Sequence, residues 1–351
     1  LMAIHLVTGG NGYLGSHLVR KLLDLGHEVR VVDLLDDPSR DTRSSFYCSD
    51  ILDKEAMLNA LKNVDVVHHN AALVPIRKAG KRFWEVNVTG TIRMLEAAKK
   101  SGVKHFSNMS SSAVFGNTTE SVCPIAQTPP ELHPIEIYGK SKAAGERVIF
   151  QHIKDNSAMT ASIIRPRTIV GKGRLGIFSI LFEWISENRN IYIIGDGSNN
   201  YQFAHVDDLV NASIKSASKR YSGELNIGTD RYGTLRDTLE SLIKHAGSES
   251  NVVSLPVSLS IISLWTLDKL RLSPLGPWHY LSFHKPLHFD LELEKKVLDW
   301  TPKYSSEEIL ITSYDWYINN KNLFNNKFGD KKSAHQGSVN QGILKILKKL
   351  S

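Results

Sequence analysis

The sequence predicts an α/β protein with a doubly wound parallel sheet and a smaller C-terminal domain. Short runs rich in β-branched residues alternate with segments of helical periodicity through the first half of the 351-residue chain. This alternation is typical of parallel strands joined by crossover helices. A glycine-rich segment lies between the first strand and the first helix. After Pro166 glycines crowd the loops, and from about Asn251 prolines and aromatic residues replace the alternation.

The predicted strands follow one another at the spacing of βα units. They lie within residues 3–10, 27–33, 64–72, 105–112 and 161–166, with a further short strand before Asp50. Helices are predicted at 13–25, at 83–101 and from Tyr138 onward. Parallel strands need such crossover helices, which cover the faces of the sheet.

Composition limits the class of the protein. No run reaches the roughly 18 to 20 apolar residues that span a membrane, and no basic-then-apolar signal region leads the sequence. Cys48 and Cys123 lack the spacing of a disulfide framework or a zinc site. The net charge is +7, but five lysines lie in residues 331–351, so the excess belongs mainly to a tail. We expect a cytoplasmic protein that binds no metal and no nucleic acid.

The segment TGGNGYLG (residues 8–15) follows the first strand and opens the first helix. Gly9, Gly12 and Gly15 let the backbone approach a pyrophosphate, free the N–H groups of the helix N-terminus and permit close packing of helix on strand. A glycine-rich turn without a ligand is the alternative. The strand–turn–helix context predicts a Rossmann-type domain that binds NAD here, with Tyr13 and Leu14 among the contacts.

Acidic residues at later strand ends indicate which dinucleotide is bound and where its adenosine lies. Asp33 lies about twenty residues beyond the glycines, where a carboxylate can accept hydrogen bonds from ribose hydroxyls and would repel a 2′-phosphate. Arg40 and Arg43 could instead favour NADP, but Asp33 predicts NAD. Asp50 and Ile51 follow the next strand and could meet the adenine, although an aspartate before a helix also serves as an N-cap.

These motifs divide the chain. Residues 1–165 are predicted to form the NAD-binding domain, to which 199–228 return. Residues 166–198 and 229–330 are predicted to form the domain that binds a small-molecule substrate, and 331–351 a flexible basic tail.

Three serines, Ser110 to Ser112, end the apolar run at 105–109, and YGKSK supplies Tyr138 and Lys142. Four residues apart on a helix, Tyr138 and Lys142 share one face. The pair alone fits an ordinary helix surface. A functional role for the pair is favoured by its place in an ordered set of motifs. The set consists of the glycine loop, Asp33, NAA (70–72), NVTGT (87–91), the serines and then Tyr138 with Lys142.

This ordered set resembles the extended short-chain dehydrogenase/reductase family of NAD-dependent sugar epimerases and dehydratases. The similarity runs over about residues 3–320 and includes RPRTIVGKG (165–173), GDGSNNYQFAHVDDLV (195–210), LNIGT (225–229) and LDWTPKYS (298–305). It implies an NAD-dependent enzyme.

The resemblance implies that Ser111, Tyr138 and Lys142 are catalytic, with the ending VFG selecting Ser111. Tyr138, as phenolate, would take the proton of a secondary alcohol while hydride passes to NAD, and Ser111 would orient the oxygen. A free tyrosine has a pKa of about 10, so Lys142 and the oxidised nicotinamide would have to supply stabilising positive charge.

The resemblance also suggests further cofactor contacts. Lys142 would hold the nicotinamide ribose, and the backbone at Ala71 and Ala72 would lie beside the cofactor. Asn87 could contact the cofactor or tie down a helix. His68, His69 and His205 are interpreted as packing residues.

Two departures from family patterns shape the reaction and substrate. Ser112 and Ala113 stand where the dehydratases carry Asp-Glu and the 3,5-epimerising reductases a cysteine, so redox at one carbon is expected, as in a 4-epimerase of a nucleotide-activated sugar. Tyr201 replaces an arginine that often binds the diphosphate, for which Arg174 or Arg231 might compensate. Substrate contacts are predicted at Ser111, Arg165 and Tyr201. An NAD-dependent dehydrogenase of a sterol-like or secondary-metabolite alcohol and a noncatalytic NAD-binding sensor stay open.

Partner predictions concern two surfaces. The family resemblance implies a homodimer through the helices that start near Phe83 and Tyr138. In the tail, the polar stretch 333–342 is predicted to be a linker, followed by a short helix with its apolar residues on one arc and three lysines opposite. This helix is predicted either to contact the inner membrane surface or to dock on the enzyme itself. The apolar arc comprises Ile343, Leu344, Ile346, Leu347 and Leu350, and the lysines are Lys345, Lys348 and Lys349.

Overall fold

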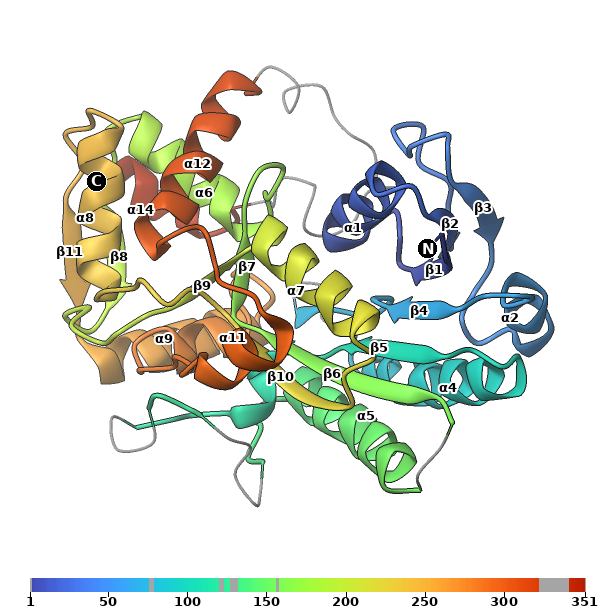
Figure 1. Ribbon diagram of the computed structural model, residues 1–351. Helices are drawn as coiled ribbons and strands as arrows, with labels where there is room; N and C mark the ends of the chain where they lie inside the picture. Colours follow the sequence, from blue (N-terminus) through green and yellow to red (C-terminus); the bar gives the residue numbers. More distant parts are fainter. Residues whose placement is uncertain are drawn as a thin grey trace.

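The computed structural model describes residues 2–75, 79–119, 123–126, 132–155, 158–321 and 341–350. Seven parallel strands form one sheet in the order β10-β6-β5-β4-β1-β2-β3, with helices on both faces (Figure 1). The predicted α/β class with a doubly wound sheet is confirmed. The strands are β1 (Ile4–Thr8), β2 (Glu28–Asp33), β3 (Ser45–Cys48), β4 (Val66–His69), β5 (His105–Met109), β6 (Thr160–Pro166) and β10 (Gly223–Ile227).

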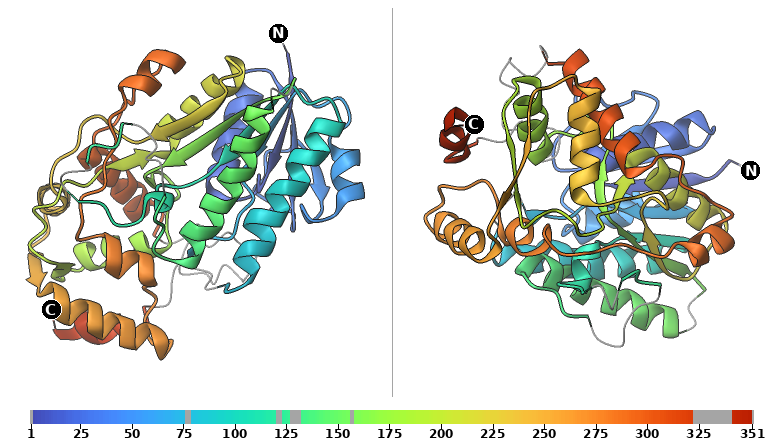
Figure 2. Two further views of the ribbon diagram at one scale, coloured as in Figure 1. Left: turned by 90° about the horizontal axis from the view of Figure 1, so that it is seen from below. Right: turned by 90° about the vertical axis from the view of Figure 1, so that its left-hand side faces the viewer.

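Helices cover the sheet because both of its faces are apolar. On one face α1 (Tyr13–Asp24) packs beside α7 (Val206–Ser218), and on the other α2 (Lys54–Ala60), α4 (Gly90–Lys100) and α5 (Ile137–Lys154) lie side by side (Figure 2). The middle strands β4 and β5 are buried along their whole length. Strand order reverses between β1 and β4, which creates a crevice at the carboxyl ends of these strands, where open parallel sheets bind ligands.

The second half of the chain packs against the carboxyl ends of the strands. Two short parallel pairs, β7 (Thr168–Val170) with β9 (Phe203–His205) and β8 (Ile191–Ile194) with β11 (Val252–Leu255), are surrounded by helices. Their apolar core gathers around Phe182, Trp184 and Tyr314. Between β9 and β11 the chain returns to the large sheet through α7 and β10. The helices are α6 (Ile177–Ser186), α8 (Leu235–His245), α9 (Val257–Lys269), α10 (Pro277–Ser282), α11 (Glu292–Leu298) and α12 (Ser306–Asn319).

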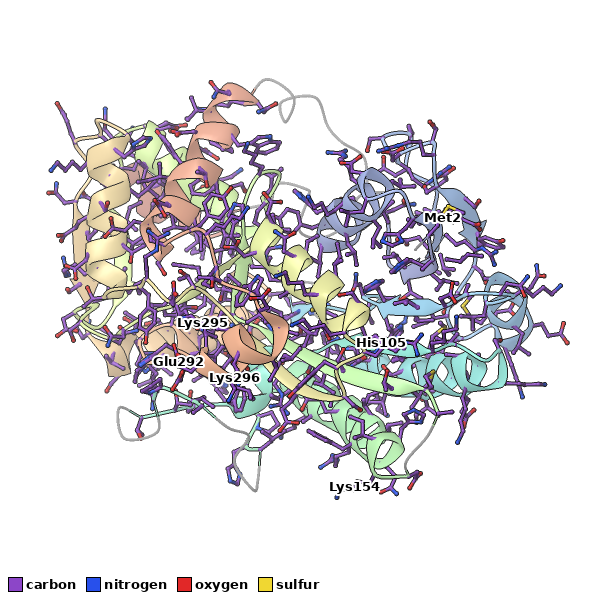
Figure 3. The ribbon with its side chains drawn as sticks, in the orientation of Figure 1. Met2, His105, Lys154, Glu292, Lys295 and Lys296 are labelled. Atoms are coloured by element: carbon purple, nitrogen blue, oxygen red, sulfur yellow. The ribbon has the colours of Figure 1, made fainter. Side chains whose placement is uncertain are left out.

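Helix α11 shows how surface charges tie these layers together. Lys295 pairs with Glu292 at 3.2 Å and with Asp230, in the loop after β10, at 2.9 Å (Figure 3). Such exposed pairs contribute about 0 to 1 kcal/mol each. The division into a cofactor domain and a substrate domain stays a prediction, as does the homodimer through α4 and α5.

The buried histidines agree with their interpretation as packing residues. His68 Nε2 lies 3.1 Å from His5 Nδ1, and His69 Nδ1 lies 2.9 Å from Thr8 Oγ1. Burial lowers the pKa of His69 to about 3, so the ring is neutral. His205 caps the N-terminus of α7 by accepting a hydrogen bond from the Asp207 amide at 3.2 Å.

The tail helix α14 (Leu344–Leu350) docks on the rest of the chain. Lys348 pairs with Glu183 and Glu187 of α6, and Gln341 accepts a hydrogen bond from Trp184 Nε1 at 3.2 Å. This favours docking over a free helix, although Ile346 and Leu347 stay exposed. Residues 331–340, which include most of the predicted linker, lie outside the described residues. Within the described ranges, none of the helices has the length and apolar character needed to cross a membrane.

Candidate active site

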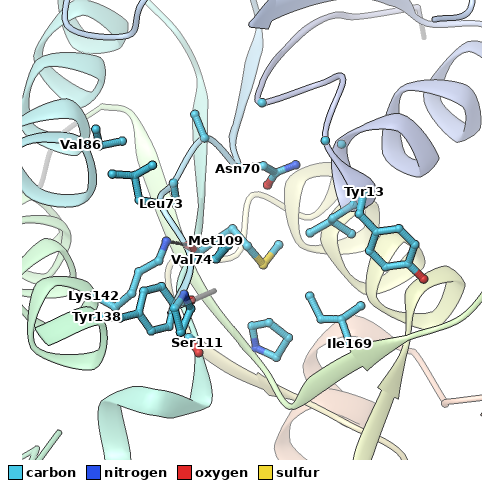
Figure 4. A pocket seen from close by; sticks show the side chains of 18 of the residues that line it. Tyr13, Asn70, Leu73, Val74, Val86, Met109, Ser111, Tyr138, Lys142 and Ile169 are labelled. Atoms are coloured by element: carbon cyan, nitrogen blue, oxygen red, sulfur yellow. Dashed lines mark hydrogen bonds between the residues drawn. The ribbon is translucent and has the colours of Figure 1, made fainter. Parts of the chain in front are cut away.

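A cavity of about 790 Å³ opens where β1, β2, β4 and β5 end (Figure 4). One side is the glycine loop and the strand ends of the sheet. The other side comes from the segment after β6 and from α6 and α10, and it carries Ile169, Phe178, Trp278 and Phe283. The cavity therefore has a polar wall for a dinucleotide and a mixed wall for a second ligand. In the described part of the chain, no cluster of His, Cys, Asp and Glu side chains is suited to a metal ion.

The glycine loop is shaped by contacts that a side chain would prevent. Gly9 has φ of +66°, and a Cβ there would lie 3.0 Å from the backbone of Ala71. A Cβ at Gly15 would lie 2.1 Å from the Gly9 carbonyl oxygen. Helix α1 begins at Tyr13, directly after Gly12, so its first N–H groups face the cavity lined by Gly9, Gly12, Tyr13, Leu14 and Gly15.

Asp33 lies at the end of β2 on the rim of the same cavity. Its carboxylate accepts hydrogen bonds from the backbone N–H groups of Asn11 at 3.0 Å and Leu34 at 2.8 Å. Burial raises the pKa of Asp33, while these two hydrogen bonds lower it. Arg40 pairs with Asp36, and Arg43 pairs with Asp24 and Asp41, so both arginines are neutralised outside the cavity.

We expect the variant Asp33→Ala to lower the preference for NAD over NADP. Loss of two charge-assisted hydrogen bonds to ribose would weaken NAD binding by about 1.5 to 3 kcal/mol each at most, and repulsion of the 2′-phosphate would disappear. Titration of both cofactors into parent and variant measures the ratio of Kd values. Asp33→Asn separates loop anchoring from charge, because it keeps a side-chain oxygen. A parent that binds NADP more tightly than NAD would contradict the prediction.

The other predicted cofactor residues fall into two groups. Asp50, Ile51, Ala71 and Ala72 line the cavity, and Asp53, not Asp50, caps helix α2. Asn87 does not line it. Its amide donates to the Leu73 carbonyl at 3.1 Å and to Ser141 Oγ at 3.0 Å, and its oxygen accepts from the Leu73 N–H at 2.8 Å. Of the two alternatives for Asn87, this arrangement supports the tie between a loop and a helix.

The structure brings Ser111, Tyr138 and Lys142 together at the end of β5 (Figure 4). Ser111 Oγ accepts a hydrogen bond from the Ala113 N–H at 3.1 Å, and the Ser111 hydroxyl acts to lower the pKa of Tyr138. Lys142 Nζ donates to the Met109 carbonyl at 2.7 Å. Glu136 caps the start of α5 through the amides of Tyr138 and Gly139, which fixes the first turn that carries the tyrosine.

Burial dominates the electrostatics of this group. It raises the pKa of Tyr138 to about 12, with the Ser111 hydroxyl acting in the opposite direction, and lowers the pKa of Lys142 to about 8. Desolvation of the phenolate outweighs the groups that lower the pKa of Tyr138, Ser111 and Arg174. Stabilisation of the phenolate by Lys142 together with the oxidised nicotinamide stays a prediction.

The prediction that Arg165 contacts substrate is corrected by its position. Arg165 is fully buried and does not line the cavity. Its guanidinium makes two hydrogen bonds to Glu146 of α5, at 2.9 and 2.7 Å, and Ser110 donates to the same carboxylate. The pair holds β6 and β5 against the helix that carries Tyr138 and Lys142.

The predicted substrate contact of Tyr201 is also corrected by the structure. It is buried and absent from the cavity wall, with its ring 4.9 Å below the Arg167 guanidinium and its hydroxyl 3.2 Å from Thr168 Oγ1. Tyr201 therefore supports Arg167 and does not face a ligand.

Sequence reasoning missed Arg167. It lines the cavity, is almost fully buried and donates to Ser112 Oγ at 3.1 Å, while its Nε and Nη2 atoms have no hydrogen-bond partner among the described residues. Arg174, which the sequence offered as a compensating arginine, also lines the cavity and lies 5.5 Å from the Tyr13 ring. Neither guanidinium has an ion pair with a carboxylate of the described residues. The signal was present in RPRTIVGKGR (165–174), where Arg167 precedes β7 and Arg174 follows the glycine turn after it.

The model of the NAD dependent epimerase/dehydratase family matches residues 5–228, most of the chain. The chain belongs to this family. It is thus an enzyme of the extended short-chain dehydrogenase/reductase group that uses NAD, as the sequence predicted. The glycine loop, whose contacts leave no room for a Cβ, and the carboxylate at the end of β2 fit such a cofactor.

Other family members differ in substrate. The chain is 37% identical to the uncharacterized protein y4nG of Sinorhizobium fredii, over 97% of this chain and 85% of that protein. It is 28% identical to sterol-4-alpha-carboxylate 3-dehydrogenase, decarboxylating, of Mus musculus, over 60% of this chain and 58% of that one. The structure of UDP-glucose 4-epimerase with UDP-glucose from Thermotoga maritima superposes with a TM-score of 0.73 at 26% identity, covering 91% of this chain and 99% of that one.

Proposed function

We propose that this family member interconverts the configuration of a secondary alcohol on a nucleotide-activated sugar, as a 4-epimerase-like enzyme. The observation that carries the proposal is Arg167, a buried cation in the cavity that has two N–H-bearing nitrogens unpaired and no carboxylate partner within the described ranges. A buried charge without a partner is costly, so an anionic ligand is needed to complete this site. The diphosphate of a nucleotide sugar supplies that anion, whereas a neutral alcohol does not.

The two cavity arginines divide between cofactor and substrate. Arg174 lies against Tyr13, at the start of the glycine-loop helix, and we assign it to the phosphate side of NAD. Arg167 is hydrogen-bonded to Ser112, the neighbour of Ser111, and we assign it to the substrate. Its planar fork suits two parallel hydrogen bonds to phosphate oxygens.

The proposed chemistry uses the three residues at the end of β5. Tyr138 takes the proton from the substrate hydroxyl and returns it after the oxidised sugar has rotated to present its other face. The Ser111 hydroxyl orients the substrate oxygen by a hydrogen bond. Lys142, held by the Met109 carbonyl, places a cation on the cofactor side of the tyrosine. When bound, NAD accepts the hydride from the carbinol carbon and gives it back. Lys142 would stabilise the phenolate that Tyr138 needs, together with the positive charge that oxidised NAD would supply.

The substrate assignment is tested with the variant Arg167→Met in the presence of NAD. We expect UDP-glucose or a related nucleotide sugar to raise the melting temperature of the parent, and the variant to lose about 10- to 100-fold in affinity, as for one or two charge-assisted hydrogen bonds. Arg231→Met is the matched control, since Arg231 is an exposed arginine outside the cavity. Equal affinities of parent and Arg167→Met would contradict the proposal.

A dehydrogenase of an apolar alcohol is the second candidate. The second-ligand wall of the cavity carries Ile169, Phe178, Trp278 and Phe283, and one curated relative is a sterol dehydrogenase. In the same thermal-shift series a neutral sterol would then stabilise the NAD-bound parent more than a nucleotide sugar does, and Arg167→Met would leave that effect unchanged.

A further inference from the structure

Exposed apolar side chains gather on α9, the turn after it and α14. Half of the exposed large apolar side chains in the described residues lie there, and α9 itself buries only Ser260. On α9, Ile262 is 63% exposed and Trp265 is 53% exposed. We name these segments, residues 257–272 and 343–349, the α9–α14 face. Its exposed apolar side chains are Val257, Leu259, Ile262, Trp265, Leu270, Leu272, Ile346 and Leu347.

The two segments of the α9–α14 face are neighbours in space. The Ile343 N–H donates to the Leu272 carbonyl at 3.1 Å, so α14 begins where the turn after α9 ends. Both views of Figure 2 place α9 and α14 along the same edge of the molecule. Lys348 points back to Glu183 and Glu187 of α6 and fixes the orientation of α14. The exposed side chains therefore belong to one surface and not to separate loops.

Positive charge surrounds this surface. Lys269, Arg271, Lys345 and Lys349 are exposed, while the acid of the same stretch, Asp268, is half-buried and accepts a hydrogen bond from Tyr280 at 3.4 Å. Exposed apolar and tryptophan side chains rimmed by basic residues are typical of helices that lie in the interface of a membrane. An apolar surface of this extent is unusual on a soluble monomer unless it meets a partner.

We propose that the α9–α14 face binds the surface of an anionic membrane, with α9 in the interfacial layer and the four cations over lipid phosphates. The charge favours lipid over a second copy of the chain. A two-fold contact through this face would bring like charges of both copies together, and such contacts are destabilising. The sequence predicted membrane contact, as one of two alternatives, for the tail helix alone. The α9–α14 face is larger, and α9 with the turn after it contributes most of its exposed apolar side chains.

Helix α9, the main part of the proposed membrane contact, lies next to an element of the catalytic cavity. Tyr280 of α10 hydrogen-bonds Asp268 of α9, and the same helix α10 carries Trp278 and His279 into the cavity wall. The enzyme would thus be held at the membrane by the side of its substrate domain. The residues of the α9–α14 face lie outside the cavity wall, so membrane contact does not depend on which alcohol the enzyme uses.

The test is co-sedimentation of the full chain with vesicles of phosphatidylcholine, with and without phosphatidylglycerol. We expect binding only with the anionic lipid, decreasing with salt. The double variant Ile262→Ser/Trp265→Ser should lose about tenfold or more in bound fraction, and so should Lys345→Gln/Lys349→Gln. The matched control is Leu25→Ser/Leu293→Ser, which removes two exposed leucines outside the α9–α14 face.

Melting temperature and NAD binding of each variant show that its fold is retained. Equal vesicle binding by the parent and Ile262→Ser/Trp265→Ser would overturn the proposal. So would a parent that does not bind vesicles but self-associates in sedimentation velocity, with the association lost in that double variant, because a second copy would then occupy the face.

Discussion

The variant Tyr138→Phe is expected to lose turnover by about 10²- to 10⁴-fold while it keeps its fold and its affinity for NAD. Only an oxygen is removed, and the neighbouring Ser111 hydroxyl acts on the pKa of this phenol. The ring packs edge-on against Phe83 at a centroid distance of 6.0 Å, and phenylalanine preserves that contact. Because the oxygen is the proposed group that exchanges a proton with substrate, its loss acts on the chemical step.

Turnover is measured with the nucleotide sugar that stabilises the NAD-bound parent, together with the melting temperature and the Kd for NAD. Tyr314→Phe is the control, since Tyr314 is also a buried tyrosine but lies in the core of the second half of the chain. Turnover of Tyr138→Phe within a few-fold of the parent would reject Tyr138 as the acid and base.

The variant Arg165→Met is expected to lower the free energy of unfolding by about 3 to 5 kcal/mol. Arg165 and Glu146 are both fully buried, at 0% side-chain exposure, and their shortest contact is 2.7 Å. Removing the arginine leaves the buried carboxylate with the Ser110 hydroxyl as its one hydrogen-bond partner among the described residues, beside the charge of Lys142. A charge in that position is poorly solvated, and the protein has to unfold or protonate it.

Chemical denaturation of parent and variants measures this effect. The double variant Arg165→Met/Glu146→Leu is expected to recover part of the lost stability, because it removes both charges and leaves no orphan. Arg231→Met breaks an exposed pair with Glu308 at 3.1 Å and should cost no more than about 1 kcal/mol. A single Arg165→Met variant as stable as Arg231→Met would show that the buried pair is not needed to hold α5.

Most of the cofactor side could be predicted from the sequence because its determinants are local. The spacing of Gly9, Gly12 and Gly15 directly after a strand fixes both the turn and the helix start, and Asp33 follows from the length of one βα unit. The same holds for the sheet, since the alternation of strands and helices specifies parallel pairing and the topology rules limit the strand order. Tyr138 and Lys142 share a helix face by their spacing alone.

The substrate side depended on which residues far apart in sequence meet. Arg165 and Arg167 are two positions apart, and strand periodicity alone would place both on the same face. They separate because β6 ends at Pro166, so that Arg165 belongs to the strand and Arg167 to the turn before β7, which RPRTIVGKG by itself does not tell. Tyr201 came to support Arg167 only through the pairing of β7 with β9. The tail pattern predicted an amphipathic helix, but its docking depended on Glu183 and Glu187 of α6.

The sequence by itself therefore determined the parallel sheet, the cofactor loop and the family, because local spacing encodes each of them. Only the tertiary structure decided that Arg165 is a buried partner of Glu146, that Arg167 lines the cavity with nitrogens left unpaired by the described residues, and that the pKa of Tyr138 rises to about 12. The physical reason is that burial, desolvation and charge pairing depend on every element packed around a side chain, and the chain brings those elements together from distant parts of the sequence.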